Sequence, residues 1–392
     1  MTKKMFGTSV GRNLAASFVA ILCVLLAACG SAQPVTSSPA AASPAADAKP
    51  ASATSAVQGS APASVKPGAA ASAAASAGGS AKLAASAAGE KVIVVYSTIA
   101  SLYLPLWYGQ EAGIFARNGI NAEVQLLSNS SAAMAALLSG NAQIYQGGGS
   151  DIVSAVVGGA DLVALATIAP VYPYKLEVAP EIKTPQDLKG KKLAIASQGD
   201  TSDVATRLTL QKFGLEPDKD VALIAVGGVP QRTAALVGGA VQGTVDSPPS
   251  VFALEAQGFH PLFDITALGL PSANQVVTVQ RSYLSSHRDL IQRYVDSMIQ
   301  SFAKLKTDKP RGVELMKRYY KSDDESAMSR GYDYATQEAI AALPYPKVEQ
   351  FKDSIDILSK TNPKVVGFNV ASILDDSFVK SAAERHLDTT PQ

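Results

Sequence analysis

Short polar segments recur along residues 91–250, and each follows an apolar run that predicts a buried strand. They combine hydroxyl, amide and carboxyl side chains with glycine, whose small size lets a ligand approach the backbone. The residues that we predict to contact a ligand are Ser97, Thr98, Tyr103, Asn129, Ser130, Gly148, Gly149, Ser150, Gly199, Asp200, Thr201, Ser202, Gly228, Asp246 and Ser247. Such groups predict reversible recognition of a small solute through hydrogen bonds. Many are also ordinary helix-capping types, and it is their clustering after strands that favours binding.

The sequence contains no arrangement that indicates catalysis, a metal site or a cofactor. The three histidines, His260, His287 and His386, lie far apart and have no neighbouring metal ligands. A Gly-x-Ser-x-Gly pattern is found at residues 7–11, inside an N-terminal segment that we expect to be removed. No phosphate-binding or dinucleotide-binding glycine pattern occurs. We therefore expect a binding protein rather than an enzyme, with no catalytic residue, metal or cofactor.

The elements that position the polar segments form a repeat. Strands are predicted at residues 92–96, 122–127 and 143–146, with helices between them, and again at 192–196 and 221–226. The stretch 136–143 is similar to 235–242, with Ala, Leu, Gly and Gln at equivalent positions. Two βαβαβ units in tandem predict two α/β lobes with parallel sheets. Beyond residue 274 the pattern is mostly helical, with an apolar stripe from Leu290 to Phe302.

In open parallel sheets, ligands bind beyond the carboxyl ends of the strands, where the polar segments lie. Two lobes that face each other across these segments would form a cleft. Helix N-termini at the cleft offer free N–H groups, which favour an anionic or strongly accepting ligand group. The alternative is one doubly wound sheet without a cleft, which the internal repeat disfavours.

The N-terminus predicts export. A positive start is followed by an uncharged apolar run, residues 14–28, which is shorter than the ~20 residues that span a bilayer. The run ends at Leu26-Ala27-Ala28-Cys29-Gly30, which resembles the lipobox of bacterial lipoproteins. We predict a signal peptide at residues 1–28 and lipidation of Cys29; the alternatives are an ordinary secretory signal that contains a cysteine and an uncleaved anchor. Cleavage would remove Cys23 and lipidation would occupy Cys29, so no disulfide is expected.

Residues 29–90 are almost entirely Ala, Ser, Pro and Gly, which predicts a disordered tether with a reach of about 40 Å. The 302 residues that follow exceed one ordinary core. The whole chain carries a formal charge of +1, and removal of Lys3, Lys4 and Arg12 would leave −2. This balance excludes the strongly basic face that nucleic-acid binding requires.

Several motifs together resemble the solute-binding proteins of importers for nitrate, sulfonate, taurine and thiamine-pyrimidine precursors. The motifs are Pro105-Leu106-Trp107-Tyr108-Gly109-Gln110-Glu111-Ala112-Gly113-Ile114-Phe115, Ala136-Leu137-Leu138-Ser139-Gly140, Leu188-Lys189-Gly190-Lys191-Lys192-Leu193-Ala194 and Arg232-Thr233-Ala234-Ala235-Leu236. Each is weak alone, but their order and spacing cover about residues 92–378.

The resemblance implies a two-lobed periplasmic-binding-protein fold of type II, with parallel-core sheets, helices on both faces and a C-terminal helical region. One lobe would comprise residues 91–180 and 270–392, and the other residues 181–269. It implies a monomeric, membrane-anchored lipoprotein outside the cytoplasm that delivers a small solute to an ABC permease. A sensor lobe for a membrane receptor is an alternative, and a pyrimidine-precursor enzyme of the same fold is a weaker one.

The sequence leaves three residues and the solute undecided. Trp107 and Tyr145 fit either the core or the ligand site, and Arg232 fits either a structural role or an anion clamp. Hydroxyl-rich loops with Tyr103 favour a small organic solute, either a heterocycle or an organic acid or sulfonate.

Overall fold

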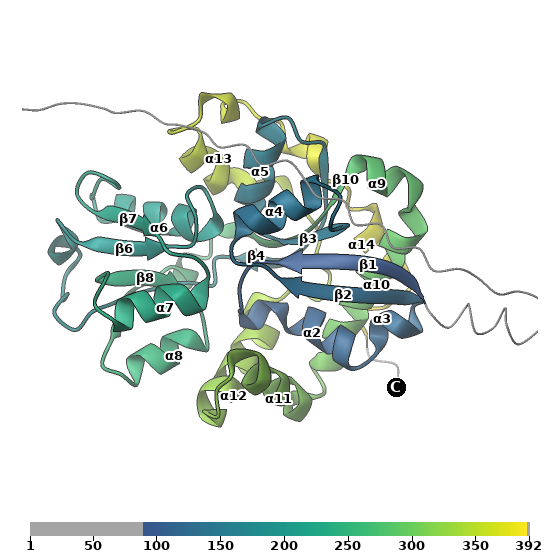
Figure 1. Cartoon of the computed structure of the whole chain (residues 1–392), viewed down its shortest axis with the longest axis horizontal. Coiled ribbons are helices and arrows are strands. Elements are labelled where there is room, and N and C mark those ends of the chain that lie inside the picture. The colour runs from purple at the N-terminus through teal and green to yellow at the C-terminus, as the bar shows by residue number, and fades with distance from the viewer. Residues whose placement is uncertain (1–88, 390–392) are drawn as a thin grey trace, which may run out of the picture. The chain divides into compact units, whose positions relative to one another are not determined.

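The computed structural model describes residues 89–389, which lie within one compact unit. Two five-stranded sheets organise this part of the chain (Figure 1). We call the part built on the first sheet the first lobe and the part built on the second sheet the second lobe. The protein therefore has the mixed α/β, two-lobed architecture that the sequence predicts.

The first sheet has the order β2-β1-β3-β10-β4. Its strands are β1 (Glu90–Tyr96), β2 (Ile120–Leu126), β3 (Ile144–Gly147), β4 (Leu162–Val171) and β10 (Pro271–Gln280). β1 pairs in parallel with β2 and β3, whereas β10 is antiparallel to β3 and β4. Val94 and Val95 project to opposite faces of β1 and each joins a separate apolar cluster, so both faces of this sheet are covered.

The second sheet repeats this plan in the order β7-β6-β8-β5-β9. Its strands are β5 (Lys175–Val178), β6 (Lys192–Ile195), β7 (Ala222–Ala225), β8 (Gly243–Asp246) and β9 (His260–Asp264). β6 pairs in parallel with β7 and β8, and β5 is antiparallel to β8 and β9. In both sheets one antiparallel strand therefore interrupts an otherwise parallel order.

The repeat seen in the sequence has a structural basis. Gln143 Oε1 accepts a hydrogen bond from the Ile93 N–H at 2.9 Å, and Gln242 Oε1 accepts one from the Lys192 N–H at 3.2 Å. Each glutamine directly precedes one strand and binds the backbone of the neighbouring parallel strand. The two similar segments hold equivalent places in the two lobes.

Helices pack on both sheets. Those of the first lobe and the C-terminal region are α2 (Leu104–Glu111), α3 (Ile114–Arg117), α4 (Ser130–Leu138), α5 (Gly149–Val157), α9 (Arg281–Ser286), α10 (Arg288–Leu305), α11 (Lys309–Tyr320), α12 (Glu325–Tyr334), α13 (Lys352–Leu358) and α14 (Ser377–Glu384). Those of the second lobe are α6 (Thr201–Lys212), α7 (Val229–Val237) and α8 (Ser250–Glu255).

The chain crosses between the lobes twice, between β4 and β5 and between β9 and β10. The sequence predicts that the first lobe extends to residue 180, but β5 pairs within the second sheet. The lobe boundary therefore falls near Tyr174. The prediction missed it because the pairing of β5 with β8 and β9 is a long-range contact that no local sequence pattern reveals.

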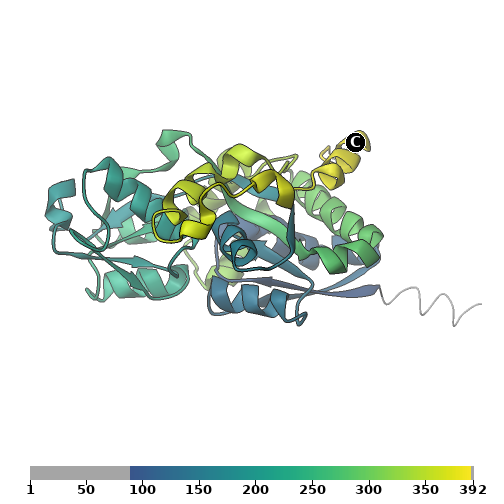
Figure 2. The same cartoon turned by 90° about the horizontal axis from the view of Figure 1, so that it is seen from above.

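The C-terminal region contacts both lobes. Ile357 of α13 packs in the core of the second lobe, whereas Phe351 and Leu358 pack in a core cluster of the first. Figure 2 shows this yellow-green segment running along both parts of the molecule. The assignment of residues 270–392 to the first lobe alone therefore omits a contact with the second.

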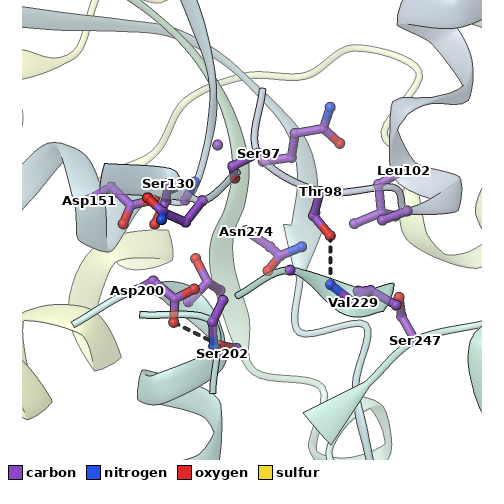
Figure 3. Close-up of a pocket in the computed structure, with 18 of the residues that line it drawn as sticks. Ser97, Thr98, Leu102, Ser130, Asp151, Asp200, Ser202, Val229, Ser247 and Asn274 are labelled. Carbon is purple, nitrogen blue, oxygen red and sulfur yellow. Dashed lines mark hydrogen bonds between the residues drawn. The ribbon is translucent and has the colours of Figure 1, made fainter. Parts of the chain in front are cut away.

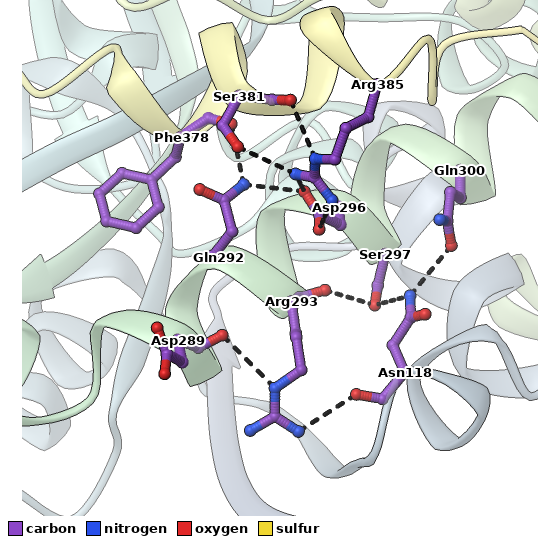
Figure 4. A network of polar contacts seen from close by, with 10 residues as sticks. All are labelled: Asn118, Asp289, Gln292, Arg293, Asp296, Ser297, Gln300, Phe378, Ser381 and Arg385. Carbon is purple, nitrogen blue, oxygen red and sulfur yellow. Dashed lines mark hydrogen bonds and ion pairs between the residues drawn. The ribbon is translucent and has the colours of Figure 1, made fainter.

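A polar network attaches the last helix to α10 (Figure 4). Arg385 donates to both carboxylate oxygens of Asp296, at 2.6 and 2.7 Å. Gln292 donates to Asp296 and to the Phe378 carbonyl, at 2.8 and 3.0 Å. Because Asp296 is only 6% exposed, this paired geometry stabilises the packing of α14 more than a surface ion pair would.

The predicted signal peptide, lipidated Cys29 and the tether up to residue 88 lie outside the described residues, whereas Glu90, which was predicted as the end of the tether, begins β1. Within residues 89–389, no helix has the length and apolar character needed to cross a membrane.

Candidate functional site

A cavity of about 60 Å³ lies between the two lobes (Figure 3). It is lined by Ser97, Thr98, Ala100, Leu102, Tyr103, Asn129, Ser130, Gly147, Gly148, Asp151, Tyr174, Ala196, Asp200, Thr201, Ser202, Gly228, Val229, Arg232, Ser247, Asn274 and Gln275. These residues come from both lobes, mostly from the loops and helix N-termini next to the strands.

Four helices present their N-termini to the cavity. Asn129, Gly148, Asp200 and Gly228 are the N-cap residues of α4, α5, α6 and α7, and all four line it. Asn129 accepts from the Ala132 N–H at 2.9 Å and Asp200 accepts from the Asp203 N–H at 2.9 Å, as capping residues do. The same residues therefore occupy helix N-cap positions and line the cavity.

Direct hydrogen bonds connect the lobes around the cavity. The Val229 N–H donates to Thr98 Oγ1 at 3.0 Å, and the Ser101 hydroxyl donates to the Pro248 carbonyl at 2.9 Å. At the crossovers, the Tyr174 hydroxyl donates to Asn274 Oδ1 at 2.9 Å. These bonds hold the facing surfaces together and leave only a compact space between them.

Two glycines permit this close approach. A Cβ at Gly148 would lie 2.0 Å from Thr201 Oγ1, on the opposite lobe. A Cβ at Gly228 would lie 3.1 Å from Thr98 Oγ1, a tight but less severe contact. Both glycines have negative φ angles, so they are required here for space and not for an unusual backbone conformation.

Two carboxyl groups line the cavity, one from each lobe: Asp200 is buried and Asp151 is partly buried. Asp151 Oδ2 accepts from the Tyr145 hydroxyl at 2.6 Å and from the Gly148 N–H at 3.2 Å. Burial, and next the negative charge of Asp200, raise the pKa of Asp151 to about 7. Burial also raises the pKa of Asp200, although hydrogen bonds from Asp203 and Ser202 oppose this. Both carboxyl groups therefore hold protons more strongly than an ordinary aspartate does, and a bound cation would favour their charged forms.

Arg232 lines the cavity but is fixed within the second lobe. It is 3% exposed and donates to Thr244 Oγ1, to the Gly227 carbonyl and to the Val245 carbonyl, at 3.2, 3.4 and 3.3 Å. Its positive charge lowers the pKa of Asp246, which burial raises to about 6. Its role in the second lobe is therefore structural as well as electrostatic.

The structure brings most of the predicted site residues together. Those that line the cavity are Ser97, Thr98, Tyr103, Asn129, Ser130, Gly148, Asp200, Thr201, Ser202, Gly228 and Ser247. The others, Gly149, Ser150, Gly199 and Asp246, do not line it.

Packing explains these four exceptions. A Cβ at Gly149 would meet Ala273 and Phe351, so this residue faces the core, and the adjacent Ser150 is only 1% exposed. A Cβ at Gly199 would face Leu358 of α13. Asp246 accepts from the Thr233 hydroxyl and the Ser247 N–H and is enclosed in the second lobe.

Asp151, Tyr174, Asn274 and Gln275 line the cavity but were not predicted. Asp151 lies in the first turn of α5, directly after Ser150, the last predicted site residue of that segment. Tyr174, Asn274 and Gln275 flank the crossovers. The sequence signal that could have indicated them is the presence of polar residues beside buried strands. Of the residues left undecided, Trp107 and Tyr145 are fully buried and do not line the cavity, whereas Arg232 does.

Two α/β lobes joined by two crossovers, with a polar cavity between them, define the periplasmic-binding-protein fold, the fold of solute-binding proteins. The chain belongs to the NMT1/THI5-like family, whose model matches residues 100–308, more than half of its length. Proteins of this class bind small solutes outside the cytoplasm and work with ABC permeases. A comparison with curated proteins gives no match.

Solved structures of binding proteins share the fold. The alkanesulfonate-binding protein SsuA from Xanthomonas axonopodis pv. citri, bound to MOPS, matches with a TM-score of 0.62 and 16% identity, over 73% of this chain and 98% of that one. The periplasmic nitrate-binding protein NrtA from Synechocystis PCC 6803 matches with a TM-score of 0.61 and 14% identity, over 76% and 89%. At these identities the likeness concerns the fold.

One similar structure is an enzyme. The desulfurization enzyme DszB matches with a TM-score of 0.54 and 15% identity, over 76% of this chain and 99% of that one. Within residues 89–389, none of the three histidines lines the cavity, and no cluster of three or more His, Cys, Asp or Glu residues is placed to hold a metal ion.

Proposed function

We propose that this protein is the extracytoplasmic solute-binding component of an ABC importer, and that it captures a small organic solute between its lobes. The observation that carries the proposal is the polar cavity, to which both lobes contribute helix N-termini and buried side chains. Membership of the NMT1/THI5-like family supports it.

A ligand in this cavity would couple recognition to lobe closure. Contacts to Asp151 and Asp200 are available together only when the lobes face each other as they do here. A solute that contacts both lobes stabilises the closed arrangement, and a permease can recognise that arrangement as the loaded state. The predicted site residues that line the cavity are the proposed ligand contacts.

The proposal includes a lipid anchor at Cys29 and a monomeric exported form. In a bacterial host, Cys29→Ala should release the protein from membranes or leave it as a larger, uncleaved precursor. A processed, membrane-bound product from both forms, seen by fractionation and mass spectrometry, would contradict the anchor.

The proposal assigns no catalytic role. The desulfurization enzyme with this fold shows that the architecture can support catalysis. The described cavity instead combines hydroxyl, amide and carboxyl groups with one arginine, a set suited to reversible binding.

The test is solute screening followed by uptake. A solute at about 100 times its dissociation constant adds ~2.7 kcal/mol to stability, which raises the melting temperature by several degrees. The identified solute should enter cells that express the full chain faster than cells that lack it. Binding without any change in uptake would favour a sensor instead, and chemical conversion of the bound solute would favour an enzyme.

A further inference from the structure

The charges that face the cavity are unbalanced. Asp151, which is partly buried, and Asp200, which is buried, supply two carboxyl groups, and Arg232 is the one basic residue among the lining residues. Arg232 also faces Asp246 and directs hydrogen bonds to Thr244 and two carbonyl oxygens of its own lobe. The guanidinium therefore acts on Asp200 and Asp246, whereas it is not among the groups that act on Asp151.

The Asp200 carboxyl group has one oxygen available to a ligand. Its Oδ1 accepts from the Ser202 hydroxyl at 2.7 Å and from the Asp203 N–H at 2.9 Å. Its Oδ2 accepts no hydrogen bond from any residue in the range 89–389. Figure 3 shows Asp200 and Asp151 together at one side of the cavity, from opposite lobes.

A second, independent acceptor lacks a partner. Gln275 is 1% exposed, lines the cavity, and its Oε1 accepts no hydrogen bond in the described part of the chain. Its orientation is set because its Nε2 donates to Gln146 Oε1 at 2.9 Å, while Gln146 Nε2 donates to the Tyr294 hydroxyl at 2.8 Å. A buried amide oxygen without a partner is costly, so a donor from a ligand would stabilise it.

We propose that the solute carries a compact cationic donor group, an organic ammonium or amidinium, which Asp151 and Asp200 hold from opposite lobes and Gln275 orients. Charge-assisted hydrogen bonds from such a group would satisfy the free acceptors and balance the carboxylates. Tyr103 and Tyr174 line the same cavity and add ring surfaces that attract cations. This inference rests on the proposed function and narrows its solute class.

An oxyanion fits this arrangement poorly. Although the helix N-termini favour anions, a sulfonate or nitrate in the same space would face two carboxyl groups. The small volume, about 60 Å³, also limits the enclosed part to a head group. An open groove that shares Asn129 and Ala196 with the cavity provides room for the rest of the solute.

The test uses two sets of compounds that differ in charge and little in shape: acetamidinium, acetamide and acetate, and benzamidinium, benzamide and benzoate. Binding to the purified full-length chain is measured by thermal shift and calorimetry at pH 7.5. In at least one set we expect the cation to bind about tenfold more tightly than its neutral and anionic counterparts.

Variants locate the effect. Asp200→Asn and Asp151→Asn keep an oxygen acceptor but remove the charge, and each should reduce the preference for the cation about tenfold. Asp203→Asn is the matched control, because Asp203 is a buried acid on the same helix that does not line the cavity. It should retain the preference even if it lowers the melting temperature.

The outcomes separate the inference from the proposed function. If an anion or a neutral compound binds most tightly in both sets, or if cation binding does not respond to Asp151 and Asp200, the inference fails and the proposed function stands. If none of the six compounds binds, the inference also fails. If a wider panel of amines, amino acids and sulfonates gives no binding either, the proposed function fails with it.

Discussion

Each lobe has a connection from a strand to a helix that carries an aspartate, and the two aspartates have different surroundings. We call the connection in the first lobe the first corner and that in the second lobe the second corner. In the first lobe β3 leads into α5 through residues 147–151, and Asp151 lines the cavity. In the second lobe β8 leads into α8 through residues 246–250, and Asp246 is enclosed. Asp246 has Arg232, Thr233 and the Ser247 N–H around it, whereas the partners of Asp151 are uncharged.

The difference separates a structural carboxyl group from an available one. The pKa of Asp246 rises to about 6 and that of Asp151 to about 7, in both cases mainly because of burial, but an arginine opposes the shift only at Asp246. Asp246 is the last residue of β8 and Asp151 lies in the first turn of α5, so both acids are near the carboxyl ends of equivalent strands, but an arginine acts only on Asp246.

The largest effect is expected when the second corner loses its countercharge. Arg232→Met should lower the free energy of unfolding at pH 8 by about 3 kcal/mol, because Asp246 is left buried and unpaired. The loss should shrink at pH 5, below the pKa of about 6 for Asp246, where that group is protonated. Urea denaturation at both pH values measures it.

The exposed Lys219, which pairs with Glu216, provides the control: Lys219→Met should leave the unfolding free energy unchanged within error. Equal losses for Arg232→Met at the two pH values would contradict an electrostatic role for this arginine.

The next effect concerns close approach at the first corner. Gly148→Ala should weaken solute binding about ten- to hundredfold, because its Cβ would lie 2.0 Å from Thr201 Oγ1 when the lobes meet. Adding Thr201→Ala should restore much of the affinity, since the Thr201 Cβ lies 3.3 Å from the same position. Calorimetry with the identified solute checks this, and full affinity in Gly148→Ala would show that the lobes do not close as described.

The pH dependence of stability should distinguish the two acids. The folded pKa of Asp151, about 7, exceeds its ordinary value of 3.8, so the folded chain binds more protons between these limits. The free energy of unfolding should therefore fall as pH rises from about 4 to 7, by up to about 1.4 kcal/mol per unit, and then level off. For Asp246 the corresponding fall should end near pH 6.

Urea denaturation of the solute-free protein in half-unit steps checks this. Asp151→Asn should flatten the curve up to pH 7, and Asp246→Asn only up to pH 6. The groups that also act on Asp151 are Asp200, Tyr145 and Tyr103. An unchanged slope in Asp151→Asn would show that this group does not titrate as its surroundings indicate.

The smallest effect is expected at the glycine that faces the first lobe from the second. A Cβ at Gly228 would lie 3.1 Å from Thr98 Oγ1 and 3.2 Å from the Ser97 carbonyl oxygen, which small shifts can relieve. Gly228→Ala should therefore reduce solute affinity less than about tenfold. A loss larger than that of Gly148→Ala in the same assay would reverse the ranking of the two contacts.

Local patterns predicted the parallel part of each sheet and the polar segments after its strands. Strand periodicity and helix-capping residue types are properties of neighbouring residues, and they predicted β1, β6 and the polar segments that contain the N-caps Asn129 and Asp200. The similarity of residues 136–143 to 235–242 also predicted two related lobes, which both sheets confirm.

The antiparallel strands and the residues beside them required long-range information. β10 joins β3 and β4 although the whole second sheet lies between it and both of them along the chain, and β5 joins the second sheet directly after a first-lobe strand. Tyr174, Asn274 and Gln275 reach the cavity through these pairings. Whether a residue of these segments, such as Gly149 or Asp246, faces the core or the cavity depends on packing across the lobe, which a single sequence does not display.

The hydrogen bond from the Val229 N–H to Thr98 Oγ1 makes one helix depend on the other lobe for its cap. α7 begins after Gly228, which has no side chain to accept from the first free amides. Any separation of the lobes would return the Val229 amide to water while the helix itself stays folded. The deuterium exchange rate of the Val229 amide should therefore follow the frequency of lobe opening, so that this single amide reports the opening of the cleft.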